Sequence, residues 1–252
     1  MIDLSPVLRF ALLLVRPGMV VMLAPGLGGR HIPAMAKIAL TVMVALALVP
    51  SVALPTQVSD TGLALVLLKE AAIGLALAFA IQALIAGVEF AGHLASYQIG
   101  FSYAATIDPI SGVRNTMLVS LYGMLAVVAF LGVNGHHALL RTLAESYAAV
   151  PIGAMQVNPT IVAAVRDLLA MIFVVGLRLA APVLIVLFIV ELVIGLISRA
   201  APSLSFMVIG YPLRIVIGLF IVGALIAAIP GVTTSMLESA LMLAGRTAAA
   251  FR

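Results

Sequence analysis

Ionisable side chains that interrupt long apolar stretches are the residues of this sequence most able to do chemistry. The five clearest cases are Arg16, Glu70, Glu89, Arg178 and Glu191. Inside an apolar environment such groups serve ion or proton pathways, or they form buried structural pairs. None of them shares a helix face with a second charged cluster. We therefore favour the structural role and expect these charges to be buried between neighbouring subunits.

Metal binding has weak support in the sequence. Glu89 and His93 lie four residues apart, which places them on one helix face, but two ligands do not make a metal site. His136 and His137 are adjacent, so on a helix their side chains leave the axis about 100° apart. The Asn134-Gly135 dipeptide before them is typical of a turn followed by a helix N-terminus. We predict neither a metal nor any other cofactor.

Enzyme signatures are missing from the sequence. It contains no nucleophile elbow, no zinc-protease motif, no P-loop and no dinucleotide-binding glycine motif. Asp108 is the one acid between residues 90 and 115 after Glu89, and Pro109 follows it directly. An Asp-Pro pair initiates a turn more often than it supplies a lone base. The sequence therefore predicts no catalytic residue.

Small residues recur at every fourth position near the middle of the chain, at Gly92, Ser96 and Gly100. On a helix this spacing makes a groove in which another backbone can approach closely. The alternative is a local kink or an irregular turn. We favour close helix packing.

The composition differs from that of a soluble protein. The chain has 252 residues, of which 64% are hydrophobic and 9% are charged, with a net charge of +4. Soluble domains carry about 25% charged residues, so this chain has too few to cover its outside. The basic residues are scattered without interleaved aromatic residues, which argues against nucleic-acid binding. Cysteine is absent, which excludes disulfides and thiolate chemistry.

The elements that must position these residues are apolar helices. Strand alternation is absent, so the sequence predicts an all-α, integral membrane-class protein of helical hairpins with about six long apolar helices and no soluble domain. We expect 161–198 to be a hairpin or a strongly kinked helix, because it exceeds one simple span. We read 134–160 as a moderately polar connection and Pro230-Gly231 as the end of the sixth helix. The expected apolar segments are 7–24, 38–49, 63–88, 117–133, 161–198 and 215–230, with a short tail helix to 252.

Three blocks together resemble one known family over nearly the whole chain. The first block comprises Arg16-Pro17, Pro25-Gly26-Leu27-Gly28, Ile32-Pro33 and Lys37-Ile38. The second comprises residues 92–109 with Tyr97-Gln98-Ile99-Gly100, then 130–137, then Pro151-Ile152-Gly153. The third comprises Ala181-Pro182, residues 195–202 and Gly210-Tyr211-Pro212-Leu213. In this order they resemble the FliR family of type III secretion export-gate proteins.

The resemblance implies a single FliR-like domain over residues 1–252 and a role in the flagellar type III export gate. Members of that family assemble with FliP-like and FliQ-like subunits into a closed helical channel for unfolded flagellar proteins. FlhA-like and FlhB-like proteins lie beside the channel, in the bacterial inner membrane at the flagellar basal body. The chain would then be a multi-pass, non-enzymatic subunit in contact with membrane lipid.

Three alternatives stay open. The chain could be the equivalent subunit of a virulence (injectisome) system, although Asn134-Gly135-His136-His137 is more typical of flagellar members. It could be a stand-alone secondary transporter or channel, which would need polar groups at mid-membrane and often an internal repeat. It could be an intramembrane enzyme, which would need a catalytic pair that the sequence lacks.

The resemblance also implies a loop that plugs the channel. By position this loop falls after the Gly92–Gly100 helix, and its turn-forming residues fit a break between apolar helices. Phe101 and Met117 lie near its ends. The expected plug residues are Asp108, Pro109, Ile110, Ser111, Gly112, Val113, Arg114 and Asn115.

Overall fold

The computed structural model describes most of the chain. It describes residues 2–3, 5–29, 32–55, 57–58, 60–101, 117–156, 158–200 and 206–251. The expected plug residues, Asp108 to Asn115, lie outside these ranges.

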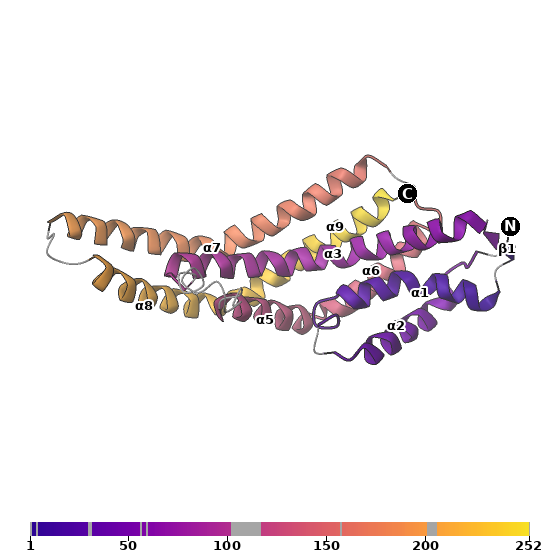
Figure 1. Ribbon diagram of the computed structural model, residues 1–252, viewed down its shortest axis with the longest axis horizontal. Helices are drawn as coiled ribbons and strands as arrows, with labels where there is room; N and C mark the ends of the chain where they lie inside the picture. Colours follow the sequence, from indigo (N-terminus) through magenta and orange to yellow (C-terminus); the bar gives the residue numbers. More distant parts are fainter. Residues whose placement is uncertain are drawn as a thin grey trace. The chain divides into compact units, whose positions relative to one another are not determined.

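Helices make up nearly all of the described chain, which confirms the predicted all-α class (Figure 1). A two-residue antiparallel strand pair is the exception, with β1 (Ile2–Asp3) paired to β2 (Gln57–Val58). A short 3-10 turn, η1 (Val49–Ser51), extends the second helix. The helices are α1 (Pro6–Leu23), α2 (Ala34–Leu48), α3 (Asp60–Ile99), α5 (Met117–Gly132), α6 (Gly135–Ala149), α7 (Thr160–Ala200), α8 (Phe206–Ile226) and α9 (Ile229–Ala250).

The number of apolar helices agrees with the prediction of about six. Among the described residues, four helices are long and apolar enough to cross a membrane: α1, α2 with η1, α3 and α7. Two further pairs qualify if each is counted as one bent span. The α5–α6 pair bends by 68° and the α8–α9 pair by 57°.

The first hairpin follows from local signals. The Ser5 hydroxyl accepts a hydrogen bond from the Leu8 amide at 3.3 Å, and Pro6 occupies the first turn, where its missing N–H costs nothing. Helix α1 ends at Leu23 before Pro25, and Gly26 adopts a φ of 79° in the turn. Helix α2 then packs back against α1 (Figure 1).

Three connections differ from the sequence-based expectation. Residues 161–198 lie in one helix, α7, with Pro182 inside it, so of the two expected alternatives, a hairpin or a strongly kinked helix, the hairpin was wrong. Most of the expected connection 134–160 is helix α6, which begins after Asn134 takes a left-handed φ of 58°. Pro230 does not end α8 but lies in the first turn of α9, where a helix tolerates proline.

The chain divides into two compact units. The first comprises Met1–Leu84, Phe130–Ala170 and Leu237–Arg252, and the second comprises Ile85–Ala129 and Met171–Met236. Each has its own apolar core. Fully buried side chains of the first include Leu12, Leu13, Ile73, Leu77, Leu139 and Leu143. Buried side chains of the second include Val88, Tyr122, Val175, Val183 and Leu187.

Glycines bring α3 and α7 into close contact within the second unit. A Cβ added at Gly87 would lie 2.8 Å from the Val175 Cβ and 3.1 Å from the Ile172 carbonyl oxygen. A Cβ added at Gly176 would lie 3.0 Å from the Gly87 carbonyl oxygen. Small residues are the usual way in which membrane helices approach this closely.

We predict that Gly87→Ala destabilises the chain, because the added methyl overlaps the Val175 side chain and crowds the Ile172 carbonyl oxygen of α7. Overpacking of this kind costs about 1–3 kcal/mol. Gly195→Ala is the matched control, because a Cβ there meets no atom within 4 Å; it should be neutral or stabilise the helix by about 0.5–1 kcal/mol. Thermal unfolding of the purified chain in mild detergent, followed by circular dichroism, compares the two. Equal unfolding temperatures would contradict the close contact.

Candidate functional site: a buried arginine cluster

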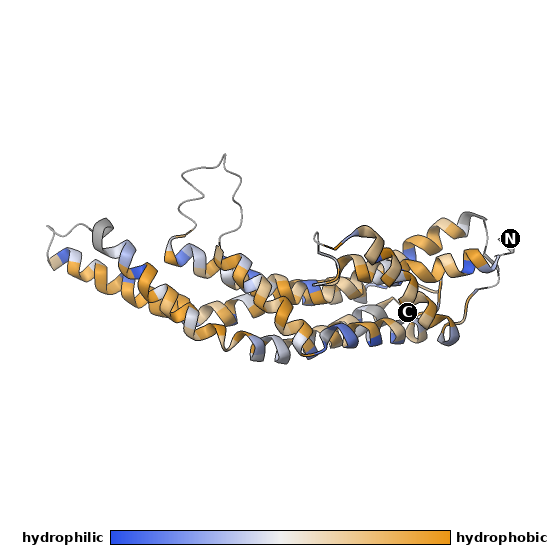
Figure 2. Ribbon diagram, turned by 90° about the horizontal axis from the view of Figure 1, so that it is seen from below, coloured by the Kyte–Doolittle hydropathy of each residue, from blue (hydrophilic) through white to orange (hydrophobic). Residues whose placement is uncertain are grey.

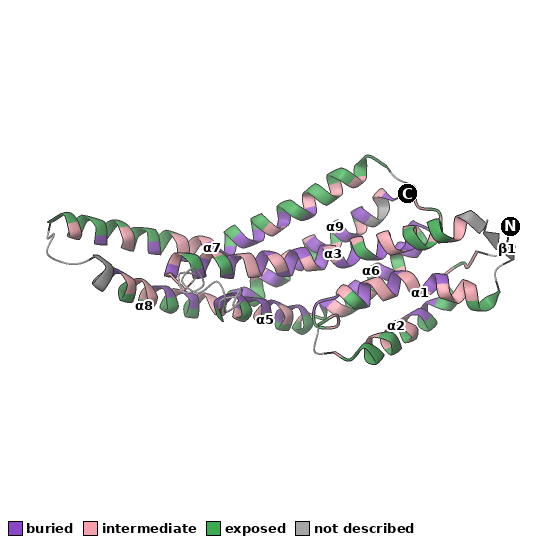
Figure 3. Cartoon of the chain, in the orientation of Figure 1, coloured by how far each residue is buried: buried purple, intermediate pink, exposed green. Residues whose placement is uncertain are grey.

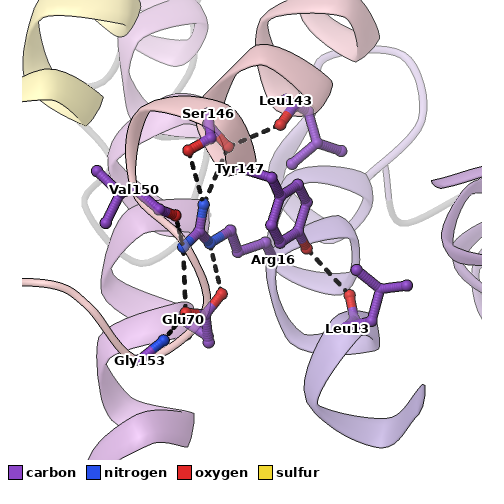
Figure 4. Close-up of polar contacts among 8 residues, drawn as sticks. All are labelled: Leu13, Arg16, Glu70, Leu143, Ser146, Tyr147, Val150 and Gly153. Carbon is purple, nitrogen blue, oxygen red and sulfur yellow. Dashed lines mark hydrogen bonds and ion pairs between the residues drawn. The ribbon is translucent and has the colours of Figure 1, made fainter. Parts of the chain in front are cut away.

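A fully buried arginine joins three helices of the first unit (Figure 4). Arg16 comes from α1, Glu70 from α3, and the remaining partners from the end of α6 and the turn after it. The Arg16 and Glu70 side chains both have 0% exposure. We call this group the Arg16 cluster; it consists of Arg16, Glu70, Ser146, Tyr147, Val150 and Gly153.

The guanidinium of Arg16 makes five hydrogen bonds, which matches its five N–H donors. Nε and Nη2 donate to the two carboxylate oxygens of Glu70, the fork geometry that suits arginine and a carboxylate. Nη1 donates to the carbonyl and hydroxyl oxygens of Ser146 at 3.1 and 3.2 Å. Nη2 also donates to the Val150 carbonyl oxygen at 2.7 Å. The positive charge therefore lies at the C-terminal end of α6, where the helix dipole favours a cation.

Glu70 connects the same charge pair to the turn that follows α6. Its Oε1 accepts a hydrogen bond from the Gly153 amide at 3.1 Å. Gly153 has a φ of 80°, a conformation that favours glycine, and its carbonyl oxygen accepts from Lys69 Nζ at 3.3 Å. Lys69 and Glu70, which are consecutive in α3, thus form hydrogen bonds with the carbonyl oxygen and the amide of Gly153, respectively.

Tyr147 compensates for the proline inside α1. Pro17 has no N–H, so the carbonyl of Leu13, four residues earlier, lacks its helical donor. The Tyr147 hydroxyl donates to that carbonyl oxygen at 3.1 Å (Figure 4). The ring of Tyr147 also lies against the Arg16 guanidinium, 4.3 Å from Cζ to the ring centroid.

A glycine on α3 allows the two helices of the charge pair to meet. A Cβ at Gly74 would lie 2.8 Å from the Arg16 carbonyl oxygen and 2.9 Å from the Met19 Cβ. Gly74 is one helical turn after Glu70, so it lies on the same face of α3. Sequence reasoning selected Arg16 and Glu70 but missed Gly74, Ser146 and Tyr147. For Gly74, its four-residue spacing from Glu70 was a signal in the sequence that both residues lie on one face of α3.

The Arg16 cluster is suited to a structural role rather than to catalysis. Every donor of the guanidinium is used, and both side chains are shielded from solvent. The ranges that the structure describes also contain no group of three or more His, Asp or Glu side chains arranged to hold a metal ion. His136 and His137 lie at the start of α6 with their rings 4.2 Å apart.

The other predicted charges occupy different settings. Glu191 on α7 accepts a hydrogen bond from Arg214 of α8 at 2.7 Å and lies 3.4 Å from Gln98 Nε2 of α3. Glu89 is half-buried, and Gly123 of α5 leaves room for its carboxylate. Arg178 is exposed on this chain. The structure therefore pairs Arg16 with Glu70, and Glu191 with Arg214, within one chain.

The small residues at four-residue spacing, Gly92, Ser96 and Gly100, occupy different settings. A Cβ at Gly92 would lie 3.1 Å from the Val119 Cα, so this glycine faces the α5 backbone closely. Ser96 is fully buried. Gly100 has a φ of 105° and follows the end of α3, where its amide and that of Phe101 donate to the Ser96 carbonyl oxygen.

Large apolar side chains remain uncovered on several helices. Figure 3 shows exposed residues along α2, α7 and α8, and Figure 2 shows that these helices are mostly hydrophobic. Within the most apolar 18-residue stretch of each helix, 11% of the residues of α2 and 22% of those of α7 are buried, against 61% of those of α3. Exposed side chains on α7 include Phe173, Leu177, Ile185, Phe188, Leu192 and Leu196. Such surfaces mark contact with lipid or with other proteins.

We predict that Arg16→Met destabilises the chain strongly, because it leaves the Glu70 carboxylate buried without its partner. Removing one partner of a buried pair costs about 3–5 kcal/mol. The double variant Arg16→Met with Glu70→Met should lose less than Arg16→Met alone. Arg166→Gln is the control, since its side chain is 75% exposed beside Asp167 and should change stability by less than about 0.5 kcal/mol. Circular dichroism melting measures all three; a double variant worse than the single would contradict the pairing.

Comparison with known proteins identifies the family. The model of "Bacterial export proteins, family 1" matches residues 7–240. The flagellar biosynthetic protein FliR of Escherichia coli is 35% identical over 207 residues, which cover 82% of this chain and 79% of that protein. FliR of Bacillus subtilis is 29% identical over 86% of this chain and 84% of its own length. The surface presentation of antigens protein SpaR of Shigella sonnei is 26% identical over 61% of this chain and 59% of its own length. The chain therefore belongs to the FliR family of bacterial type III export proteins.

Proposed function

We propose that this chain is a non-enzymatic subunit of the flagellar type III protein export gate. In this role it functions as one domain and assembles with FliP-like and FliQ-like subunits into a gated channel for unfolded flagellar proteins. FlhA-like and FlhB-like proteins are the expected neighbours, in the bacterial inner membrane at the flagellar basal body. The observation that carries the proposal is an export-family chain whose helices leave large apolar faces uncovered.

The uncovered faces favour a subunit over a stand-alone transporter. A transporter concentrates polar groups around a central substrate site. Here the most completely buried charge cluster is satisfied internally, whereas α2 and α7 present mostly apolar side chains. Partner subunits that cover these faces would bury apolar area and stabilise the assembly.

Similarity to SpaR supports a second candidate, the equivalent subunit of an injectisome. The flagellar assignment takes precedence, because the FliR relatives are more similar over more of the chain. Motility distinguishes the two candidates. Deletion of the gene should abolish swimming and leave no extracellular filament if the flagellar assignment is correct.

We predict that the chain co-purifies with the FliP-like and FliQ-like proteins of the same cell. Co-expression, extraction in mild detergent and native mass spectrometry should give one large complex of fixed mass, because the exposed faces of α2 and α7 are then covered. Phe188→Asp is the informative variant, since this side chain is 58% exposed on α7; a charge in an apolar interface should reduce the yield of complex. A chain that purifies alone under these conditions would return the transporter to first place.

We also propose that residues 108–115 plug the closed channel. The proposal rests on the family resemblance and on the position of this segment between α3 and α5. Met117, at its C-terminal flank, is 89% exposed, although it is a large apolar side chain. It is therefore available to contact a partner surface beside the plug.

Deleting residues 110–114 should raise ion leak through the assembled gate, because the shortened segment no longer fills the channel. The leak is measured as growth inhibition and membrane depolarisation in cells that express the whole gate. Cells that express the deletion variant without the partner subunits are the control and should not leak. An unchanged leak in the complete assembly, at equal protein level, would rule out the plug assignment.

A further inference from the structure

Two adjoining cavities lie between α1 and α2 in the first unit. One has a volume of about 340 Å³ and is lined by Met22, Ile32, Ala34, Lys37 and Ile38. The other, of about 150 Å³, shares three of these residues, Met22, Lys37 and Ile38. It continues deeper along the hairpin past Leu14, Gly18, Thr41 and Val42. We call the two cavities together the hairpin groove.

The groove has the dimensions of a hydrocarbon chain. Leu14, Gly18 and Met22 follow one another at every fourth position of α1, so they line one face of that helix. At 1.5 Å per residue these three positions span roughly 12 Å along the axis. Gly18 keeps the groove open between the helices, because a Cβ there would contact the Thr41 Cγ2 at 3.6 Å. The lining is apolar apart from Lys37 and Thr41.

A single cation lies where the two cavities of this groove adjoin. Among the residues that line either cavity, Lys37 is the charged one. Its Nζ donates to the Gly28 carbonyl oxygen at 2.8 Å, in the turn between the helices. An ammonium has three N–H donors, so the group can serve a further acceptor without giving up this bond. Lys37 is half-buried, with its alkyl stem along the apolar lining and its charge at the turn.

The depth of the cation agrees with a lipid headgroup. Helices α1 and α2 with η1 are each 18 residues long, the length of a short membrane span. As membrane spans, the two helices would place the turn between them at the level of the headgroups, which lysine side chains extend to reach. From Lys37 the smaller cavity runs past Gly18 and Leu14, away from the turn.

We propose that the hairpin groove binds one anionic phospholipid. Its phosphate accepts from Lys37 Nζ, and one acyl chain lies along Met22, Gly18 and Leu14. Charge complementarity selects the anionic lipid, since a basic side chain near a membrane surface contributes about 1 kcal/mol toward anionic headgroups. The lipid covers part of the α2 face that the chain itself leaves exposed, and the site depends on neither the plug nor the order of subunits.

The test is native mass spectrometry of the full chain, both alone and co-purified with its partner subunits. Each sample is exchanged into detergent that contains equal amounts of phosphatidylglycerol and phosphatidylcholine with the same acyl chains. The expected result is one retained phosphatidylglycerol in both samples, at about fivefold preference over phosphatidylcholine. Using both samples separates this proposal from the export-gate proposal, because the chain alone reports on the groove even if no complex forms.

Substitutions separate the headgroup from the acyl chain. Lys37→Gln keeps a donor for Gly28 but removes the charge, so it should abolish the fivefold preference, and Lys37→Arg should retain it. Gly18→Leu fills the floor of the groove and should reduce retention of both lipids. Arg166→Gln, which removes an exposed cation outside the groove, should change neither.

Three results would overturn the proposal. The first is undiminished phosphatidylglycerol preference in Lys37→Gln, which would assign it to other cations. The second is undiminished retention in Gly18→Leu at native helix content, which would place the lipid elsewhere on the chain. The third is retention by the chain alone but not by the complex, which would mean that a partner helix occupies the groove.

Discussion

The buried ion pair between Arg16 and Glu70 is the constraint on which the first unit depends. Removing both charges from water costs several kcal/mol per ion, and only complete hydrogen bonding offsets that cost. The five donors of Arg16 are satisfied by groups from α3, from the end of α6 and from the residue after it. Three helices that are far apart in the sequence must therefore meet at one point with defined geometry. The pair thus fixes the register of α1 against α3 and the place where α6 ends.

Prolines and glycines in the apolar helices are accommodations to such contacts. Pro17 frees a carbonyl of α1, and the Tyr147 hydroxyl from α6 satisfies it. Gly74 lets the α1 backbone approach α3, and Gly87 with Gly176 does the same for α3 and α7 in the second unit. Where lipid is as apolar as the side chains, close approach and hydrogen bonds hold helices together more than hydrophobic burial does. These prolines and glycines therefore determine helix contacts that hydrophobicity alone does not predict.

The chain combines a buried Arg16 cluster, whose hydrogen bonds are made within the chain, with apolar faces that the chain itself leaves uncovered. The most apolar stretch of helix α3 is largely buried, whereas α2 and α7 leave large apolar side chains exposed. This combination suits a subunit that folds around its own charge pair and gains its outer cover from partners and lipid. The proposed lipid in the hairpin groove beside Lys37 is one part of this outer cover.

The sequence by itself determined the class of the protein. Its apolar content, its lack of charge and its breaks at Pro25 and Asn134 predicted apolar helices, and it singled out Arg16 and Glu70 as buried charges. Tertiary structure decided what those charges do. Periodicity places a residue on a face of its own helix, but the partner of Arg16 lies 54 positions away and its carbonyl acceptors 130 and 134 away. The same limit explains why the sequence misjudged α7 and α6. A proline such as Pro182 can either break a helix or lie within one, and a moderately polar stretch can be either a loop or a helix. Packing against neighbouring elements decides between these outcomes.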